Sequence, residues 1–330
     1  MGRRRLGANP SATIAFKSGE GVTMKSVDTS LAMRFRRLIY GSVPAVLLAV
    51  YPLQRDAIAA TVDDATTYEV SVFDVPGALD TAPLGINSQG IIVGNYFDGS
   101  VHHGFVLGKP GLQKVDYPGT TTETDVIGIN SQGELVGGYI DSSGNQQGFR
   151  SHGGVLQPFN FPGSVSGFPR AINNRGDIVG VFADVSNNIH GYSYIDGSFA
   201  QIDYPTATLT DVWGINDARE IVGFYTLADG SPHGFMLSEG SSVTIDIPGA
   251  VQILLTRNND AGTIVGDYQD GTSGVTHGFV RRHGQVSIVD GPGSSFTRLR
   301  GINGRGTIVG WFKDSNGNLH GLEAKRTDDR

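Results

Sequence analysis

The sequence predicts an all-β protein: a six-bladed β-propeller with four strands in each blade. The main observation is a ten-residue phrase at 85–94, GINSQGIIVG, which returns five times with its asparagines spaced 43, 43, 43, 43 and 44 residues apart. A fixed period of this length is typical of repeat folds. Composition agrees, because 48 glycines and only 17% charged residues suit a turn-rich β protein. The anchoring residues are Asn87, Asn130, Asn173, Asn216, Asn259 and Asn303.

Each phrase has the pattern of a tight β-hairpin. Asparagine opens a four-residue polar turn, as at Asn87, and glycine closes it, as at Gly90. Asparagine can bond its own backbone, and glycine adopts positive φ without a steric clash. The fourth copy departs from this pattern, since Arg219 stands where glycine is expected. The β-branched pair after the turn, such as Ile92 and Val93, favours a sheet that is buried on both faces.

The two ends of the repeat region complement one another. One period contains four strand-like runs, but the last copy stops near Arg326 without its fourth strand. The first strand, at 68–75, precedes any phrase and resembles the fourth strands of the other copies. We therefore expect one domain at 68–326, a ring closed by the N-terminal strand completing the last blade. A β-solenoid is the alternative, although its coils are usually shorter.

Residues 1–60 lie outside the repeat and read as a leader with a secretory signal peptide. Arg34, Arg36 and Arg37 precede the apolar stretch 38–53, and a small-residue cleavage pattern ends near Ala59. The stretch is shorter than a membrane span needs, so an uncleaved anchor is the less favoured alternative. We also expect the true start to lie nearer the basic cluster, at Met24 or Met33. This pattern predicts a secreted, extracellular or periplasmic protein.

The predicted mature chain is acidic and has no cysteine. Without residues 1–59 it keeps 16 Lys and Arg and 29 Asp and Glu, a net charge of −13. An acidic chain with no basic run is a poor binder of nucleic acid or anionic membranes, so we expect neither as a partner. We expect no stable membrane insertion after cleavage and a monomer. A domain of this size can fold without disulfides.

Two residue types recur in the repeats for reasons that we interpret as structural. An aromatic residue follows each Val-Gly pair by two positions, as at Tyr96, and we expect it to pack between blades. Histidine precedes glycine in five copies, as at His103, and Gln147 replaces it once. Equivalent positions in neighbouring blades lie too far apart to share an ion, so we expect a hydrogen bond to a nearby Asp and no metal site. Calcium in loops such as 141–145 is a less favoured alternative, because turn chemistry explains the same residues.

Candidate site residues come from the positions that vary between copies. Three and five residues before each anchoring asparagine, side chains are expected to line a channel mouth, and period two places both on one strand face. The charged and aromatic residues there are Asp125, Arg170, Asp211, Trp213, Arg298 and Arg300. Channel plugging by mutual ion pairs is the alternative to ligand binding. The sequence carries none of the nucleophile, metal or nucleotide motifs that we sought, and it assigns no catalytic residue and no cofactor.

The phrase followed by His103-Gly104-Phe105 resembles the HAF-type extracellular repeat family, with glycine where that family often has alanine. The resemblance covers about residues 68–325 and implies an exported, propeller-like protein without implying a reaction. We therefore expect a binding or interaction module for an extracellular glycan or protein. A glycan hydrolase or lyase on the same scaffold is the alternative, with Asp125 and Asp211 as a conceivable carboxylate pair.

Overall fold

The computed structural model describes residues 48–49, 53–59, 61–62, 67–120 and 122–327. The chain divides into two units, Met1–Arg36 and Arg37–Arg330, and every described residue belongs to the second unit. The basic cluster at Arg34, Arg36 and Arg37 and most of the predicted apolar stretch lie outside the described residues. Among the residues described, all regular structure is β, and none forms a helix long and apolar enough to cross a bilayer.

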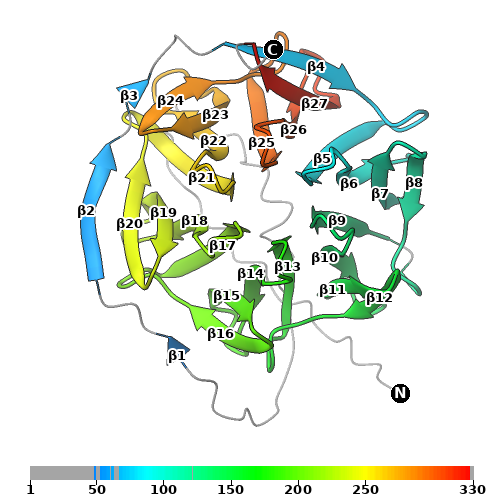
Figure 1. Cartoon of the computed structure of the whole chain (residues 1–330), viewed down its shortest axis with the longest axis horizontal. Coiled ribbons are helices and arrows are strands. Elements are labelled where there is room, and N and C mark those ends of the chain that lie inside the picture. Colours follow the sequence, from blue (N-terminus) through cyan, green and yellow to red (C-terminus); the bar gives the residue numbers. More distant parts are fainter. Residues whose placement is uncertain (1–47, 50–52, 60, 63–66, 121, 328–330) are drawn as a thin grey trace, which may run out of the picture. The chain divides into compact units, whose positions relative to one another are not determined.

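The second unit consists of six antiparallel four-stranded meanders, one for each copy of the phrase (Figure 1). The first three are β5 (Asp80–Ile86), β6 (Ile92–Phe97), β7 (His102–Gly108) and β8 (Gly111–Val115); β9 (Thr124–Ile129), β10 (Leu135–Ile140), β11 (Gln146–His152) and β12 (Val155–Pro158); and β13 (Ser166–Ile172), β14 (Ile178–Ala183), β15 (Ile189–Ile195) and β16 (Ser198–Ile202). The next two are β17 (Leu209–Ile215), β18 (Ile221–Thr226), β19 (Pro232–Ser238) and β20 (Ser241–Asp246); and β21 (Ala250–Asn258), β22 (Ile264–Asp270), β23 (Thr276–Arg282) and β24 (Gln285–Ile288). The last is β25 (Phe296–Ile302), β26 (Ile308–Lys313), β27 (Leu319–Arg326) and β4 (Tyr68–Phe73).

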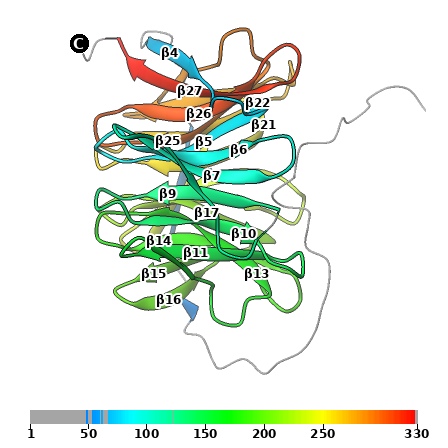
Figure 2. The same cartoon turned by 90° about the vertical axis from the view of Figure 1, so that its right-hand side faces the viewer.

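The last meander takes its fourth strand from the beginning of the repeat region. β4 pairs antiparallel with β27 from Tyr68 opposite Arg326 to Phe73 opposite Gly321. Figure 2 shows β4 lying against β27, although the two strands are about 250 residues apart in the sequence. A single parallel bridge, between Thr276 and Phe296, joins the fifth and sixth meanders into one nine-stranded sheet. This pairing agrees with the expected role of residues 68–75.

The phrase hairpins link the meanders to one another. In the first copy, Oδ1 of Asn87 accepts hydrogen bonds from the backbone N–H groups of Gln89 and Ile91, both at 3.0 Å, which holds the turn. Its Nδ2 donates to the backbone carbonyl of Asn130 in the next repeat, at 3.1 Å. The same donation recurs from every repeat to the next, and Asn303 in the last repeat donates back to Asn87 at 3.1 Å. The six asparagines therefore connect the repeats in a cycle.

The inner strands converge on a common centre and are the most buried. Every residue of β9 and β13 is buried, whereas the outer strands β8 and β12 are largely exposed. Each inner strand has a β-bulge at the residue three before the asparagine, such as Ile127 between Val126 and Gly128. The extra residue shifts the register of strand pairing at this point, which the sequence analysis did not predict.

The glycine of the Val-Gly pair explains how closely the second strand approaches the inner one. A Cβ added to Gly94 or Gly137 would collide with the carbonyl oxygen of Ala82 or Asp125 on the facing inner strand. The same collision recurs in the other four repeats. Only glycine leaves enough room for this approach.

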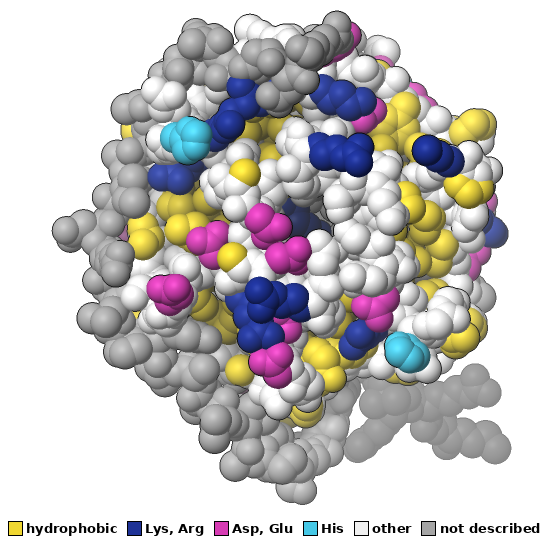
Figure 3. All heavy atoms as spheres, in the orientation of Figure 1, with side chains coloured by type: hydrophobic (Ala, Val, Ile, Leu, Met, Phe, Trp, Pro, Cys, Tyr) yellow, Lys and Arg dark blue, Asp and Glu magenta, His cyan; other side chains and the backbone are white. Residues whose placement is uncertain are grey.

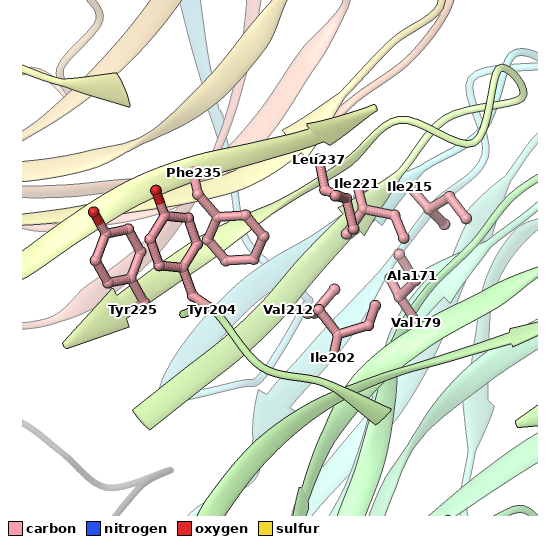
Figure 4. Close-up of a cluster of buried hydrophobic side chains, with 10 residues drawn as sticks. All are labelled: Ala171, Val179, Ile202, Tyr204, Val212, Ile215, Ile221, Tyr225, Phe235 and Leu237. Atoms are coloured by element: carbon pink, nitrogen blue, oxygen red, sulfur yellow. The ribbon is translucent and has the colours of Figure 1, made fainter. Parts of the chain in front are cut away.

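Aromatic residues form the packing between repeats, as predicted. Tyr225, two positions after the Val-Gly pair, stacks on Tyr204 from the preceding linker with centroids 3.7 Å apart and planes 5° from parallel. Figure 4 shows the two rings face to face beside Phe235, within a cluster that joins the third and fourth repeats. Equivalent stacks pair Tyr117 with Tyr139 at 3.6 Å and Phe161 with Phe182 at 4.0 Å.

Three short segments before the repeat region, two of them within the predicted leader, lie along the outer edges of the meanders. β1 (Leu48–Ala49), β2 (Leu53–Ala59) and β3 (Thr61–Val62) pair in parallel with β16, β20 and β24 respectively. Cleavage near Ala59 would remove β1 and β2 and leave the six meanders intact, because none of their four strands lies before Tyr68.

Candidate functional site

The structure brings four of the predicted site residues together where the inner strands converge. Arg170, on β13, donates from Nε to Oδ1 of Asp211 at 3.0 Å and from Nη2 to Oδ2 at 2.7 Å, a bidentate pair across neighbouring repeats. The guanidinium carbon of Arg170 lies 3.5 Å from the ring centroid of Trp213, and that of Arg300 lies 4.9 Å from the same centroid. Two guanidinium groups therefore contact the same indole ring, which favours a fixed ring position.

Arg300 and Arg298 share a carboxylate that the sequence analysis did not identify. Arg300 Nη1 donates to Oδ1 of Asp267 at 2.7 Å, and Arg298 Nε lies 3.7 Å from Oδ2 of the same residue. Asp267 comes from β22, the second strand of its meander. The position directly after the Val-Gly pair varies between copies, so the criterion used for the inner strands would also have selected Asp267. We call Arg170, Asp211, Trp213, Asp267, Arg298 and Arg300 the central cluster.

The remaining predicted residue, Asp125, lies apart from these ion pairs. It accepts a hydrogen bond from Nδ2 of Asn95 on β6, and no ion pair to it is found among the described residues. Burial raises the pKa of Asp125 well above its ordinary value, and the charge of Glu123 adds to this rise. Burial therefore favours the neutral form of this carboxyl group. Asp211 has different surroundings, because both of its carboxylate oxygens are bound by Arg170.

A basic side chain occupies the convergence point itself. Arg257 donates from Nη1 to the carbonyl oxygens of Trp213 and Thr256, at 2.6 and 2.8 Å. Its Nη2 donates to the carbonyl oxygens of Ile127 and Arg170, at 3.1 and 2.6 Å. One guanidinium thus binds the bulge residues of four inner strands. Figure 3 shows a hollow near the centre of one face with a basic side chain deep inside it.

The charge of Arg257 is balanced by dipoles rather than by a carboxylate. No ion pair to it is found among the described residues, and burial lowers its pKa to about 9, with Arg170 and Arg300 adding to the decrease. The guanidinium still carries its proton at neutral pH. Carbonyl oxygens from four strands provide the negative end of four dipoles, which stabilises a buried cation.

The sixth repeat adds a basic and aromatic surface to the central cluster. Arg298 lies over the rings of Phe296 and Trp311, at 4.9 and 5.5 Å from their centroids, and the two rings stack at 5.6 Å. Lys313 Nζ lies 5.1 Å from the Phe296 centroid. The Arg298 side chain keeps 19% of its surface exposed, whereas Arg170 and Arg300 keep 6% and 5%. Arg298 is therefore the most exposed of the three arginines, and the half-buried rings of Phe296 and Trp311 lie beside it.

The recurring histidines bind aspartates, as predicted. Nδ1 of His103 lies 2.7 Å from Asp116 Oδ1, and the same pairing occurs at His190, His233, His277 and His320 at 2.6 to 2.9 Å. In the second repeat both members change together, since Gln147 accepts a hydrogen bond from Asn160 at 2.8 Å. A neutral pair thus replaces the ionisable one at the same place. Within the described residues, no group of three His, Asp or Glu is arranged to hold a metal ion.

The aspartates of the outer loops act as turn caps. Oδ1 of Asp141 accepts hydrogen bonds from the backbone N–H groups of Ser143 and Asn145, both at 2.9 Å. Asp184 and Asp314 do the same in their own loops. Local turn chemistry accounts for these residues.

Comparison with known proteins identifies a fold but no family. No family model and no curated protein sequence matches the chain. Among solved structures, a protein provisionally identified as TolB from Agrobacterium tumefaciens is similar at a TM-score of 0.53 and 10% identity, over 79% of this chain and 99% of that one. A looser likeness is to the Aleuria aurantia lectin in complex with Fucα1-6GlcNAc, at a TM-score of 0.48 and 11% identity, over 75% and 93% of the two chains. The six meanders and the likeness to the TolB-type structure together show an architecture of the β-propeller type.

Proposed function

We propose that the protein is an exported six-bladed β-propeller of the HAF repeat type that acts as a binding module for an extracellular glycan or protein. Export rests on the leader pattern at 1–60. The six-bladed, closed reading is supported by the asparagine cycle and by the pairing of β4 with β27. Closure of this kind removes exposed sheet edges and produces a rigid scaffold.

The observation that carries the binding proposal is the surface formed by Arg298, Phe296 and Trp311. Two stacked rings and a guanidinium lie together on strands that are fixed by the central ion pairs. An aromatic face suits the apolar side of a sugar ring or a peptide side chain, and a guanidinium donates to hydroxyl, carboxylate or carbonyl oxygens. The ligand would therefore bind at this edge of the central cluster, while Arg170, Asp211 and Arg300 hold the surface in place.

A glycan array, followed by affinity measurement on any hit, tests the proposal. Arg298→Ala should weaken binding at least about tenfold, because it removes an accessible charged donor. Arg305→Ala, an exposed turn substitution, serves as the control and should bind like the wild type. If no glycan binds, a proteomic pull-down from the extracellular fraction tests the protein ligand, again with Arg298→Ala for comparison. Equal capture by both variants would contradict the proposed surface.

Asp125 favours the alternative, a glycan-active enzyme. A buried carboxyl group whose pKa is raised has the property required of a general acid, and Glu123 lies two residues away on the same chain segment. A reducing-end assay on glycans that bind the protein separates the two functions. Product release that disappears in Asp125→Asn would favour the enzyme, whereas binding without product release would favour the module.

A further inference from the structure

A pocket lies at the junction of the third and fourth repeats. It has a volume of about 300 Å³ and is lined by β15, β16 and the linker that leads into β17. None of the six central-cluster residues lines it. We call it the linker pocket, and the residues that matter below are His190, Gln201, Asp203, Tyr204, Pro205 and Thr206. A volume of this size lies at the lower end of small-molecule sites.

Thr206 has a backbone conformation that disfavours its side chain. Its φ is +66°, in the left-handed region, where a β-branched residue is a rare outlier. The other five linkers have glycine at this position, and all five glycines also have positive φ. They are Gly77, Gly119, Gly163, Gly249 and Gly293. All six linkers thus adopt positive φ at this position. Only this linker has a residue with a hydroxyl-bearing side chain there. Strained residues of this kind cluster at ligand sites.

Gln201 is a second departure, and it faces the same pocket. Its Nε2 donates to Oδ2 of Asp203 at 2.6 Å and lies 3.0 Å from Nδ1 of His190. His190 Nδ1 also lies 2.8 Å from Oδ1 of Asp203. The residues two before the equivalent Asp or Asn in the other repeats are Val72, Lys114, Pro158, Thr244 and Ile288. A cross-linked group of amide, carboxylate and imidazole therefore forms one polar wall that no other repeat has.

The other wall is apolar and rigid. The Tyr204 ring is 4% exposed and stacks on Tyr225, and its hydroxyl lies 2.9 Å from Oγ1 of Thr244 (Figure 4). Pro205 follows with a backbone restricted by its ring. The pocket lining thus combines apolar surface from Pro205, Ala207 and Leu209 with the fixed polar groups of His190, Gln201 and Asp203.

We propose that the linker pocket binds a neutral, hydroxyl-rich small molecule of monosaccharide size. A sugar ring has hydroxyl groups at its edge and an apolar C–H face, which matches the two walls. The polar wall contains the carboxylate of Asp203, and Asp184 lies 3.5 Å from the other ring nitrogen of His190, so the wall disfavours an anionic ligand. This site is separate from the Arg298 surface, and each can exist without the other.

Saturation-transfer NMR with D-glucose, D-galactose, D-mannose and L-fucose tests the proposal on the purified protein. We expect saturable binding of at least one sugar. Gln201→Ala should weaken that binding at least about tenfold, since it removes a fixed donor. Thr206→Gly should also weaken it while raising the melting temperature, because glycine relieves the left-handed strain.

Two controls distinguish this site from the rest of the molecule. Lys114→Ala changes the position equivalent to Gln201 in the first repeat, and Arg305→Ala changes an exposed turn of the sixth repeat. Both should leave sugar binding in the linker pocket unchanged. The proposal is overturned if none of the four sugars binds saturably, or if Gln201→Ala and Thr206→Gly bind the sugar as tightly as the wild type. If Arg298→Ala loses sugar binding while Gln201→Ala and Thr206→Gly keep it, the sugar binds at the central cluster. That result would also overturn the proposal.

Discussion

The anchoring asparagine shows how one residue type can be required six times in a chain. Its Oδ1 holds its own turn, and its Nδ2 reaches the next repeat. Aspartate would keep the acceptor but lose the donor, and serine would be too short to make both contacts. The repetition of the phrase therefore reflects a bond between repeats as well as local turn chemistry.

Arg219 is explained by contacts outside its own turn. It has a φ of +65° in the position where other copies have glycine. Its Nε donates to Asp177 Oδ2 at 2.9 Å, and its Nη2 donates to Asp196 Oδ1 at 2.5 Å. These bonds join the fourth repeat to the third and offset the strain of a side chain at positive φ.

Arg257 supports the first prediction at this scale. Replacing it with alanine removes the donor that binds four carbonyl groups, so the free energy of unfolding should fall by about 2 kcal/mol, a typical value for hydrogen bonds to a charged group. Urea denaturation measures the change. Arg305→Ala, on an exposed turn, should change stability by less than about 0.5 kcal/mol. Equal stability of Arg257→Ala and the wild type would mean that water replaces the guanidinium at the convergence point.

At the scale of strands, each pair of histidine and aspartate joins two neighbouring strands of one meander. The histidine lies on the third strand, and the aspartate lies at the end of the fourth. The second repeat makes the same link with Gln147 and Asn160, which shows that the geometry matters more than the charge. The aromatic residue beside each histidine completes the unit, as where Tyr225 and His233 stack at 5.3 Å. The outer two strands of each meander are thus joined by one polar pair, and an aromatic ring packs beside that pair.

These pairs predict a dependence of stability on pH. Hydrogen bonds from the protonated rings to Asp203 and Asp74 raise the pKa of His190 and of His320. A raised pKa stabilises the fold fully below the unfolded value of about 6.5, and this contribution is lost as pH rises through the folded value. Burial favours a higher pKa for Asp184, but its hydrogen bonds outweigh burial and lower it, so that contribution is lost as pH falls below about 4. The melting temperature should therefore be highest between about pH 4.5 and 6.5 and should decline toward pH 8. A melting temperature that rises from pH 6 to pH 8 would contradict this sign.

The second repeat, with its neutral pair of Gln147 and Asn160, suggests a substitution that tests the pair of His320 and Asp74. The double substitution His320→Gln with Asp74→Asn copies the neutral pair of the second repeat. It should keep the fold at pH 8 and show a smaller decline in melting temperature between pH 6 and pH 8. Asp74→Ala alone should lower the melting temperature, because it leaves the ring of His320 without the partner that joins β27 to β4. Thermal melts of the three proteins at both pH values measure the difference.

At the scale of the whole described unit, the arrangement depends on a strand from one end completing the sheet at the other. The last phrase would otherwise leave β27 as an unpaired edge. Six backbone-paired positions and the bond between His320 and Asp74 hold β4 there. An open edge of this kind is a template for pairing with a second molecule.

Deleting residues 68–75 tests this closure. We expect the shortened protein to associate or aggregate and to melt at a lower temperature, because the edge of β27 becomes exposed. Size-exclusion chromatography with light scattering, together with thermal melts, measures both effects. A protein that lacks residues 1–59 is the matched control, since it loses only outer strands and should remain monomeric. A monomeric deletion protein with unchanged melting would contradict the role of β4.

Much of this architecture could be predicted because its causes are local. The period, the hairpin at each phrase, the partner of the recurring histidines and the strand that completes the last sheet follow from turn chemistry and from likeness between copies. The central residues were selected by the same likeness, since positions that vary between identical scaffolds stand out. Arg170, Asp211, Trp213 and Arg300 do meet, but as ion pairs and ring contacts that bury most of their surface.

The sequence by itself determined the repeating unit, since each hairpin depends on residues within about ten positions of one another. Only the tertiary structure decided which variable side chains meet. Arg300 bonds Asp267 across 33 residues, and Arg257 reaches the carbonyl of Ile127 across 130. The bulge in each inner strand and the strain at Thr206 are likewise features of backbone geometry. Such contacts depend on how six strands converge and on where a register shifts, and neither quantity is set by the order of residues within a single repeat.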